Sequence, residues 1–516
     1  MKFISSAAIV LGLGTTFTAA FAGAASAEGP CAFSTAEIAK VLPKNGPTAA
    51  PGNGLPNPPV DNDCDFYKWA WESFLYVTER RPDNKPAFLS YPTIERAFPK
   101  VFSPPGTAAA AVTAPSMLTL SVRNIEPALS AKTKWSQAIA ADVLGDAAPV
   151  LDDGVMQAGQ AGAGAVLVDR NRNPVFYTIH VNQTFADFVQ ANGLDDMTRM
   201  FADPTNPDDV KSKNPVPADL EFRTGSMEFK SSWMILDGPV SNYPNYITTR
   251  AKIPVLKNEP NKTGQGTHLV VDKSKPLREV NVGLLGLHVV GVIDGHPEFI
   301  WASFEHANDK TGERDVAPAA HDNPAPSNTP PQTIDNANKN YPVFAANTPV
   351  DKANIPVNQP VGPDQKFTNP TPVFRIFPGS ASKRPDDAPP GKWEDPAITD
   401  LNQQMTTLFA GKDPAGKDWR RNYRLVGAVW MNQPRKDGFK EGMVFSNDDP
   451  LLAGENRLSN ASIESFTQTA APHCFSCHTT DVQDQDLGTK FLPARRINIS
   501  HVFTIVAKKF LSSSKQ

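Results

Sequence analysis

Residues 284–304 read LLGLHVVGVIDGHPEFIWASF and predict the clearest β-hairpin of the chain. Its two arms, Leu284–Ile293 and Glu298–Phe304, are apolar and rich in β-branched or aromatic side chains, which favour strands. Asp294-Gly295 between them is a dipeptide that favours the tight turn of an antiparallel pair. The hairpin therefore indicates a β-rich body.

The rest of the chain alternates between strand and helix patterns. Alternation of apolar and polar residues predicts further strands at 164–168, 175–181, 231–236, 246–253 and 424–431. Helical spacing or capping signals predict helices at 34–42, 64–80, 184–192, 398–409, 460–470 and 499–510. The 49 prolines exclude a chain made mainly of long helices or central strands. We therefore expect an α+β fold with a β-rich body, long Pro-rich loops and a helical C-terminal segment.

The length of 516 residues is enough for two or three domain-sized units. We expect a leader at 1–27, a β-rich body with N-terminal helices at 28–315, a Pro-rich region at 316–395 and a C-terminal region at 396–516. Scattered apolar residues in the Pro-rich region favour a loop docked on the body over a free linker.

The N-terminus has the pattern of a secretory signal peptide. Lys2 precedes an apolar, small-residue stretch that ends at Ala25-Ser26-Ala27, a typical cleavage site. A membrane anchor is the weaker interpretation because threonines interrupt this stretch, and no later stretch reaches the roughly 20 apolar residues that span a bilayer. We expect a periplasmic or secreted protein with no membrane span in its mature chain. The net charge of -4 argues against nucleic acid as a partner, since that binding requires a basic surface.

Two of the four cysteines lie near the start of the exported chain. Cys31 and Cys64 are 33 residues apart. An oxidising compartment favours a structural disulfide between them, which would tie the first predicted helix to the second. A redox-active pair is the alternative, although the spacing is not that of a C-x-x-C motif.

The other two cysteines lie in Cys474-Phe475-Ser476-Cys477-His478, the C-x-x-C-H pattern of c-type haem attachment. Residues i and i+3 of a helical turn project to one side, so both thiols can bond to the two vinyl groups of one porphyrin. His478 would then be the proximal ligand of the iron. Because this attachment follows export, the signal peptide supports one covalent haem c as the cofactor.

A C-x-x-C pair has other uses: a structural disulfide, a redox dithiol or half of a zinc site. A zinc site needs partner ligands at similar spacing, and the sequence has no second C-x-x-C. A thioredoxin-like dithiol usually opens a helix after a strand, whereas this motif follows the helix predicted at 460–470.

The sixth iron ligand cannot be a downstream methionine, because no methionine follows His478. Small c-type cytochromes, which share the motif, carry such a distal methionine after it. His501 is the only downstream histidine and starts the last predicted helix, so we expect it to be the second metal ligand. His473 is poorly placed to reach the other face of the haem. The upstream rivals are Met405, Met431 and Met443.

Arg495 and Arg496 precede the last predicted helix. A guanidinium matches a carboxylate bidentately, so both arginines could bind the haem propionates. Two solvated surface charges are an equally plausible interpretation.

One face of the 284–304 hairpin is expected to be polar. With an even turn, residue alternation places His306 on the opposite face. The polar face would carry His288, Trp301, Ser303 and Glu305. Such a face could bind a substrate or a second metal, or contact the haem. A structural polar network beneath the Pro-rich loop, or a solvated sheet face, is the favoured interpretation, since buried polar groups usually satisfy one another.

Several of these segments resemble a family of large secreted bacterial proteins usually called cytochrome c family proteins. The resemblance spans most of the mature chain and is carried by Gly286–His288, Trp301–His306, Trp71–Leu75, Lys230–Trp233 and the terminal C-x-x-C-H. It implies a haem site and no particular substrate.

Together these patterns favour a periplasmic mono-haem protein that transfers electrons, because an iron with two histidine ligands has no open position for a substrate. Its partner would be a redox protein or a small redox molecule. The length in excess of what one haem needs keeps two alternatives open. One is a haem-dependent oxidoreductase with a substrate pocket or second metal site in the β-rich body, and the other is a haem-based sensor.

Overall fold

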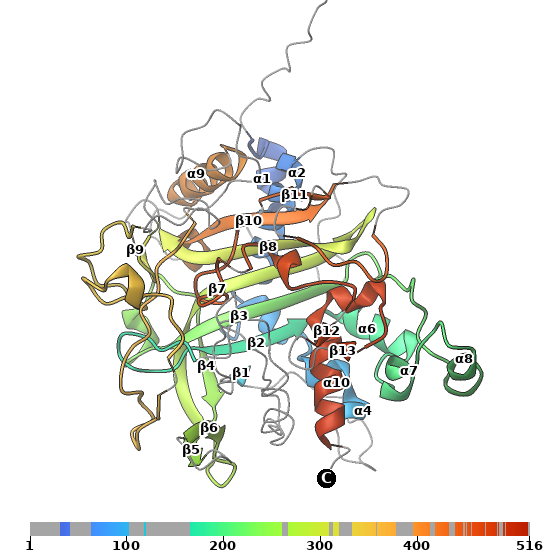
Figure 1. Cartoon of the computed structure of the whole chain (residues 1–516). Helices are drawn as coiled ribbons and strands as arrows, with labels where there is room; N and C mark the ends of the chain where they lie inside the picture. The colour runs from blue at the N-terminus through green and yellow to red at the C-terminus, as the bar shows by residue number, and fades with distance from the viewer. Residues whose placement is uncertain are drawn as a thin grey trace, which may run out of the picture.

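A computed structural model of the chain shows an α+β protein built on a large, mostly antiparallel sheet (Figure 1). The leader expected at 1–27 lies outside the described residues. The structure describes residues 31–41, 63–102, 118–119, 166–260, 267–308, 313–318, 333–357, 359–377, 396–412, 418–432, 439–446, 449, 451–455, 457–469, 471–481, 483–484, 489–490 and 492–513.

The hairpin predicted at 284–304 forms and extends beyond those limits. β7 spans Arg278–Ile293 and β8 spans His296–Asn308. Gly295 in the turn has a φ of +79°, a left-handed conformation that glycine adopts without a steric penalty. Leu287 lies opposite Phe304 in the antiparallel register, so the predicted pairing is confirmed.

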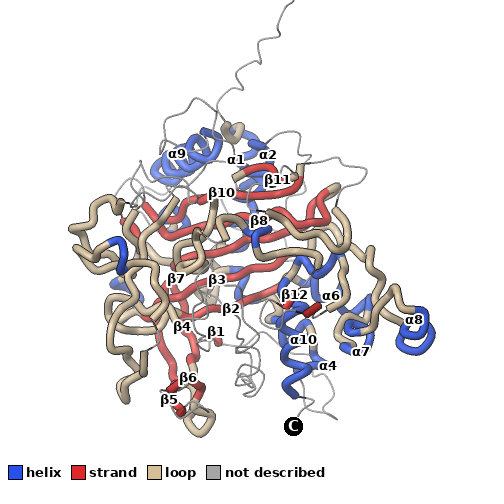
Figure 2. The backbone as a smooth tube through the Cα atoms, in the orientation of Figure 1, coloured by secondary structure: helices blue, strands red, loops and turns tan. Residues whose placement is uncertain are grey.

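Seven further strands extend the hairpin into a nine-stranded sheet (Figure 2). Beyond β8 the sheet continues through β10 (Tyr423–Met431) and β11 (Leu452–Gly454), and β9 (Glu313–Arg314) also pairs with β8. On the other side, β7 pairs with β3 (Met227–Ile235) and β4 (Thr248–Ile253), β3 with β2 (Phe176–Val181), and β4 in parallel with β1 (Leu118–Thr119). Two small hairpins lie apart: β5 (Leu256–Pro260) with β6 (Thr267–Val271), and β12 (Gln483–Asp484) with β13 (Thr489–Lys490).

Helices cover both faces of the sheet, because alternate side chains of each strand point to opposite sides. Leu287 and Phe304 point into a core with α2 (Asp63–Val77) and α9 (Pro396–Lys412). Trp301 points into a second core with α6 (Gln183–Asn192) and α10 (His501–Ser513). The shorter helices are α1 (Thr35–Val41), α3 (Ile94–Ala97), α4 (Pro99–Phe102), α7 (Met197–Phe201) and α8 (Pro207–Lys213). Among the described helices, none is both long and apolar enough to cross a bilayer.

The aromatic face predicted on the second helix packs against the sheet. Phe74 of α2 stacks on Phe304 with ring centroids 4.2 Å apart, and Phe66 stacks on Trp430 at 4.0 Å. Offset aromatic pairs add about 0.5–1.5 kcal/mol each to the free energy gained by burial. The prediction of a core helix at 64–80 is therefore confirmed, with its end three residues earlier, at Val77.

Two local predictions at the N-terminus are also confirmed. Ser34 Oγ accepts a hydrogen bond from Glu37 N at 3.3 Å, and a Glu37 carboxylate oxygen accepts one from Ser34 N at 2.6 Å, which is a capping box. Cys31 and Cys64 form a disulfide with Cα atoms 5.6 Å apart. The disulfide links the start of α1 to the start of α2, as expected.

The strand predicted at 164–168 is not formed in its described part. Among residues 166–168, only Val168 makes a β-bridge, to Pro174. Asp169 instead closes a tight turn through hydrogen bonds to Asn173, and the following proline has no N–H to extend a ladder.

The helix predicted at 460–470 is wrong. The described residues there form successive turns, and Ser459 closes the segment into a loop through bonds from its N–H to Pro472 O and from its hydroxyl to Ala471 O. The side chains of Asn460 and Ser462 form hydrogen bonds with the sheet and with a nearby backbone N–H group. Short polar side chains that compete for backbone groups in this way favour turns over helix.

We call the chain from Arg457 to His501 the C-terminal arm; its described part lies across the face of the sheet that carries Trp301. The arm approaches the sheet closely at Gly286, where an added Cβ atom would lie 2.6 Å from Asn460 Oδ1. The missing side chain therefore lets the arm contact the backbone of β7. The arm brings the C-x-x-C-H motif onto the sheet.

Candidate functional site

Cys474 and Cys477 lie on one tight helical turn at the surface of the second core. The turn is a short 3-10 helix, Cys474–Ser476, in which Cys474 O accepts hydrogen bonds from Cys477 N at 3.1 Å and from His478 N at 2.9 Å. Both cysteines are free thiols. The turn geometry that the motif requires is therefore present, although turns and not a helix precede it.

The thiols do not have the properties of an activated redox pair. The surrounding protein desolvates both sulfurs, which raises the pKa of Cys474 well above its ordinary value and that of Cys477 to about 11, and the Glu464 carboxylate adds to both shifts. The pKa of Cys477 is raised even though part of its side chain reaches solvent. Reactive dithiols need a lowered thiol pKa, so the pair does not fit a thioredoxin-like function.

The imidazole of His478 is held on two sides. Its Nδ1 bonds to Ile499 O at 2.8 Å, and its ring centroid lies 4.0 Å from that of Trp301. An N–H donated to a carbonyl fixes the tautomer, so Nε2 carries the free lone pair. Burial lowers the pKa of His478 well below its ordinary value, which keeps the ring neutral, the form that binds metals.

His501, the expected second axial ligand, is brought next to His478. The two rings stack with centroids 3.7 Å apart and an angle of 17° between their planes. His501 Nε2 donates to Cys477 O at 3.0 Å, and burial lowers the pKa of His501 to about 4. Two imidazoles on opposite sides of a haem cannot stack directly on each other, so ligation by both requires the His501 ring to leave Cys477 O.

Of the three rival methionines, Met443 bonds to Thr480, two residues after the motif. Its N–H donates to Thr480 Oγ1 at 2.7 Å, and its sulfur accepts from Lys440 N at 3.1 Å. Met431 is buried on β10. Met405 lies in the α2 core on the opposite face of the sheet, which removes it as a candidate.

Arg495 is buried and structural, in contrast to both interpretations drawn from the sequence. Its guanidinium is fully enclosed, and its five N–H groups point at five backbone carbonyls: those of Arg199, Met200, Ala202, Val216 and Pro493. Because all its donors are used, Arg495 has none left for a haem propionate. Its burial lowers the pKa to about 10.

Arg496 pairs with carboxylates of the protein itself. One nitrogen bonds to Glu221, and Nε lies 3.6 Å from a Glu441 oxygen. The side chain is partly exposed, so these pairs are weak. The arginine therefore has partners already, and a propionate would have to compete with them.

The predicted polar face of the hairpin exists, and the arm and the Pro-rich region supply hydrogen-bond partners for it. The register places His288 opposite Ser303 and Gly286 opposite Glu305, with His306 on the other face. His288 bonds to Glu464 at 3.1 Å, Ser303 to Asn460 at 3.2 Å, and Glu305 to Arg375. This is the structural network that we favoured from the sequence. Trp301 is the member that touches the C-x-x-C-H motif.

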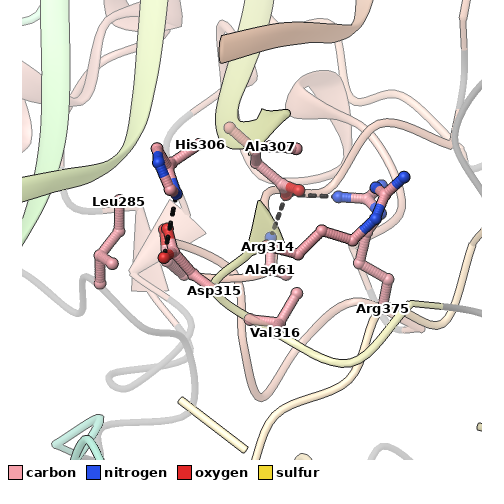
Figure 3. A pocket seen from close by; sticks show the side chains of 10 residues that line it. Leu285, His306, Ala307, Arg314, Asp315, Val316, Arg375 and Ala461 are labelled. Atoms are coloured by element: carbon pink, nitrogen blue, oxygen red, sulfur yellow. Dashed lines mark hydrogen bonds and ion pairs between the residues drawn. The ribbon is translucent and has the colours of Figure 1, made fainter. Parts of the chain in front are cut away.

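A small cavity lies at one end of this network, lined by His306, Asp315 and Arg375 among others (Figure 3). His306 Nδ1 bonds to Asp315 Oδ1 at 3.1 Å, and the Glu305–Arg375 pair closes the other side. The cavity has room for about one water molecule, which is too small for a substrate. Among the described residues, no group of three or more His, Cys, Asp or Glu side chains could hold a metal ion.

Sequence reasoning missed three charged residues near the motif. Glu228 and Lys230 lie on β3, and Glu464 lies on the arm. The charge of Lys230 acts on both motif cysteines, on His478 and on His501. The sequence could have indicated Glu228 and Lys230 through the strand pattern of 227–235, because alternate residues of a strand share a face.

No protein-family model, no curated protein and no solved structure matches this chain.

Proposed function

We propose that the chain carries one haem c, attached through Cys474 and Cys477, and transfers electrons in the periplasm to or from a redox protein or a small redox molecule. When bound, such a haem supplies an iron that changes between its ferric and ferrous states. The resemblance to large secreted cytochrome c family proteins agrees with this proposal.

The observation that carries the proposal is the state of the His478 ring. Metal-binding histidines almost always donate their other N–H to a carbonyl or carboxylate, and His478 Nδ1 bonds to Ile499 O at 2.8 Å. On the same turn, both thiols are free. Two thiols and a neutral imidazole with Nε2 available are the protein groups that covalent haem attachment needs.

The neighbouring residues hold this imidazole in position. Trp301 lies against the ring, and its own indole N–H donates to Glu298 O at 3.1 Å. The arm is fixed to the sheet on both sides of the motif, through Asn460 and through Ser500. A rigid site favours electron transfer because little has to move when charge changes.

Covalent attachment is tested by denaturing the purified protein and recording its pyridine haemochrome spectrum. We expect the haem to remain with the chain and to give the spectrum of a c-type haem, because thioether bonds survive denaturation. Haem that separates from the denatured chain would refute the proposal.

The second axial ligand is tested by His501→Ala. We propose His501 for this position because it is the only histidine after the motif in the sequence and its ring lies at the motif turn, bonded to Cys477 O. The wild-type ferric protein should be low-spin and refuse carbon monoxide after reduction, whereas His501→Ala should become high-spin and bind it. Both states are read from absorption spectra.

Met443→Leu is the matched control, because it removes the rival sulfur from the same region. A low-spin spectrum that survives in His501→Ala but not in Met443→Leu would assign the position to Met443. A wild-type protein that already binds carbon monoxide would favour a haem enzyme or sensor over electron transfer.

A further inference from the structure

Glu228 is a buried carboxyl group that bonds to Ser500, the residue before His501. It is 5% exposed on β3 and lies between Val181 of β2 and Val290 of β7 in the sheet register. Its Oε2 accepts a hydrogen bond from the Ser500 hydroxyl at 2.7 Å. No other side-chain partner of this carboxyl group occurs in the described part of the chain.

Ser500 connects Glu228 to both histidines. The carbonyl of the preceding residue, Ile499, accepts the bond from His478 Nδ1, and the next residue is His501. The hydroxyl that bonds Glu228 thus belongs to the segment that orients one imidazole and carries the other. Glu228 and the two imidazoles are therefore joined through one buried hydrogen bond and one short stretch of backbone.

A second carboxyl group on the same face, Glu464, is held differently. Glu464 contacts His288 at 3.1 Å and Lys230 at 3.9 Å, and it accepts the N–H of Asn460. These partners outweigh the effect of burial and lower the pKa of Glu464 below its ordinary value. Glu464 therefore remains charged near neutral pH.

Glu228 lacks such partners. Burial raises its pKa to about 7, and the Ser500 hydroxyl and Lys230 offset only part of that shift. The charged or titratable groups on the same face of the sheet are Lys230 on its own strand and His288 opposite it on β7. Glu464, His478 and His501 on the arm interact with Lys230. Of these, Lys230 is the one whose charge acts on Glu228.

We propose that Glu228 takes up a proton from solvent when the haem site accepts an electron, so that reduction and protonation are coupled. This inference rests on the haem proposed above. One electron enters from an external one-electron reductant, one proton enters from solvent, and an O–H bond forms at a Glu228 oxygen while no other bond breaks. The electron removes positive charge near the carboxylate and so raises its affinity for a proton. By linkage, protonation of Glu228 raises the reduction potential.

The test is the reduction potential as a function of pH, measured on the haem-bearing protein at an electrode. In the wild type we expect the potential to fall as pH rises through neutrality, toward a limiting slope of about 59 mV for each tenfold change in proton concentration. Glu228→Gln cannot take up the proton and should give a flat profile. Infrared difference spectra should show a carboxylic acid band that grows on reduction in the wild type and is missing in Glu228→Gln.

Glu464→Gln is the matched control, because it removes a carboxylate from the same face. It should raise the potential at every pH and keep the slope, since Glu464 does not exchange protons in this range. Ser500→Ala is a second variant that keeps the carboxyl group. The loss of its hydrogen bond raises the pKa of Glu228 further, so the sloping region should move to higher pH.

A flat wild-type profile, or a slope that persists in Glu228→Gln, would overturn the coupling while leaving the haem assignment intact. A chain that carries no covalent haem would overturn both proposals. The two failures are thus distinguished by the haemochrome of the same sample.

Discussion

Replacement of Cys474 and Cys477 together by alanine is expected to leave the chain without covalent haem. The wild-type chain should keep about one haem after denaturation, because two thioether bonds would hold the proposed haem and no other C-x-x-C-H exists in the sequence. Each single variant should keep a single thioether bond and a shifted haemochrome band. The measurement is haem per chain after denaturation and gel filtration.

The other cysteine pair provides the matched control. Cys31→Ser with Cys64→Ser should keep the haem but lower the free energy of unfolding by about 4 kcal/mol, because the disulfide closes a loop whose ends are 33 residues apart. Denaturant unfolding measures this loss. The assignment fails if the alanine pair at 474 and 477 retains its haem, or if the serine pair loses it at equal expression.

Glu305→Ala is expected to be strongly destabilising. Glu305 is 6% exposed, and one of its oxygens accepts bonds from both Arg375 and Ala461 N. Removal of the carboxylate leaves the Arg375 guanidinium buried without its counter-charge, which costs roughly 3–5 kcal/mol. It also removes a bond that holds the arm to β8. The shift of the denaturant midpoint measures the loss.

Glu279→Ala is the control for a surface pair. Glu279 bonds to Arg250 at 2.6 Å, but both side chains are largely exposed, so its loss should cost no more than about 1 kcal/mol. The loss of stability in Glu305→Gln should lie between those of Glu305→Ala and Glu279→Ala, since the amide keeps a hydrogen-bond acceptor but lacks the charge. Equal losses in Glu305→Ala and Glu279→Ala would show that the buried pair does not fix the arm.

The helices and strands predicted correctly are those whose conformation follows from the pattern of apolar residues within the segment itself. The helix at Ile398–Phe409 buries one face, and the spacing of its apolar residues records that face directly. The strand at Arg424–Met431 is buried on both faces, and its nearly continuous apolar run records that burial. The helix at 460–470 failed for the opposite reason. Its polar residues bond to β8 and to β3, which are more than 150 residues away in the chain, and no local pattern reveals such partners.

Arg495 has a role in the structure that neither interpretation of the sequence included, for a related reason. The sequence shows which kinds of group the Arg495 guanidinium can bind. The choice between a propionate and a carbonyl depends on which groups surround it in the fold. In the fold, α7 and its neighbours direct carbonyls of residues 199–202 toward the guanidinium. The N–H groups of a buried guanidinium need hydrogen-bond acceptors, and nearby backbone carbonyls can accept all of these bonds.

The sequence by itself determined which hairpin residues share a face, the aromatic helix that packs beneath them, the N-terminal disulfide and the C-x-x-C-H turn, since each follows from residue spacing within a short segment or from the expected compartment. The tertiary structure alone decided what surrounds that turn. Trp301 reaches His478 across 177 residues, and Glu228 reaches Ser500 across 272, because the arm folds back over the sheet. Burial, and with it the charge state of Glu228, depends on that long-range packing and cannot be read from neighbours in the chain.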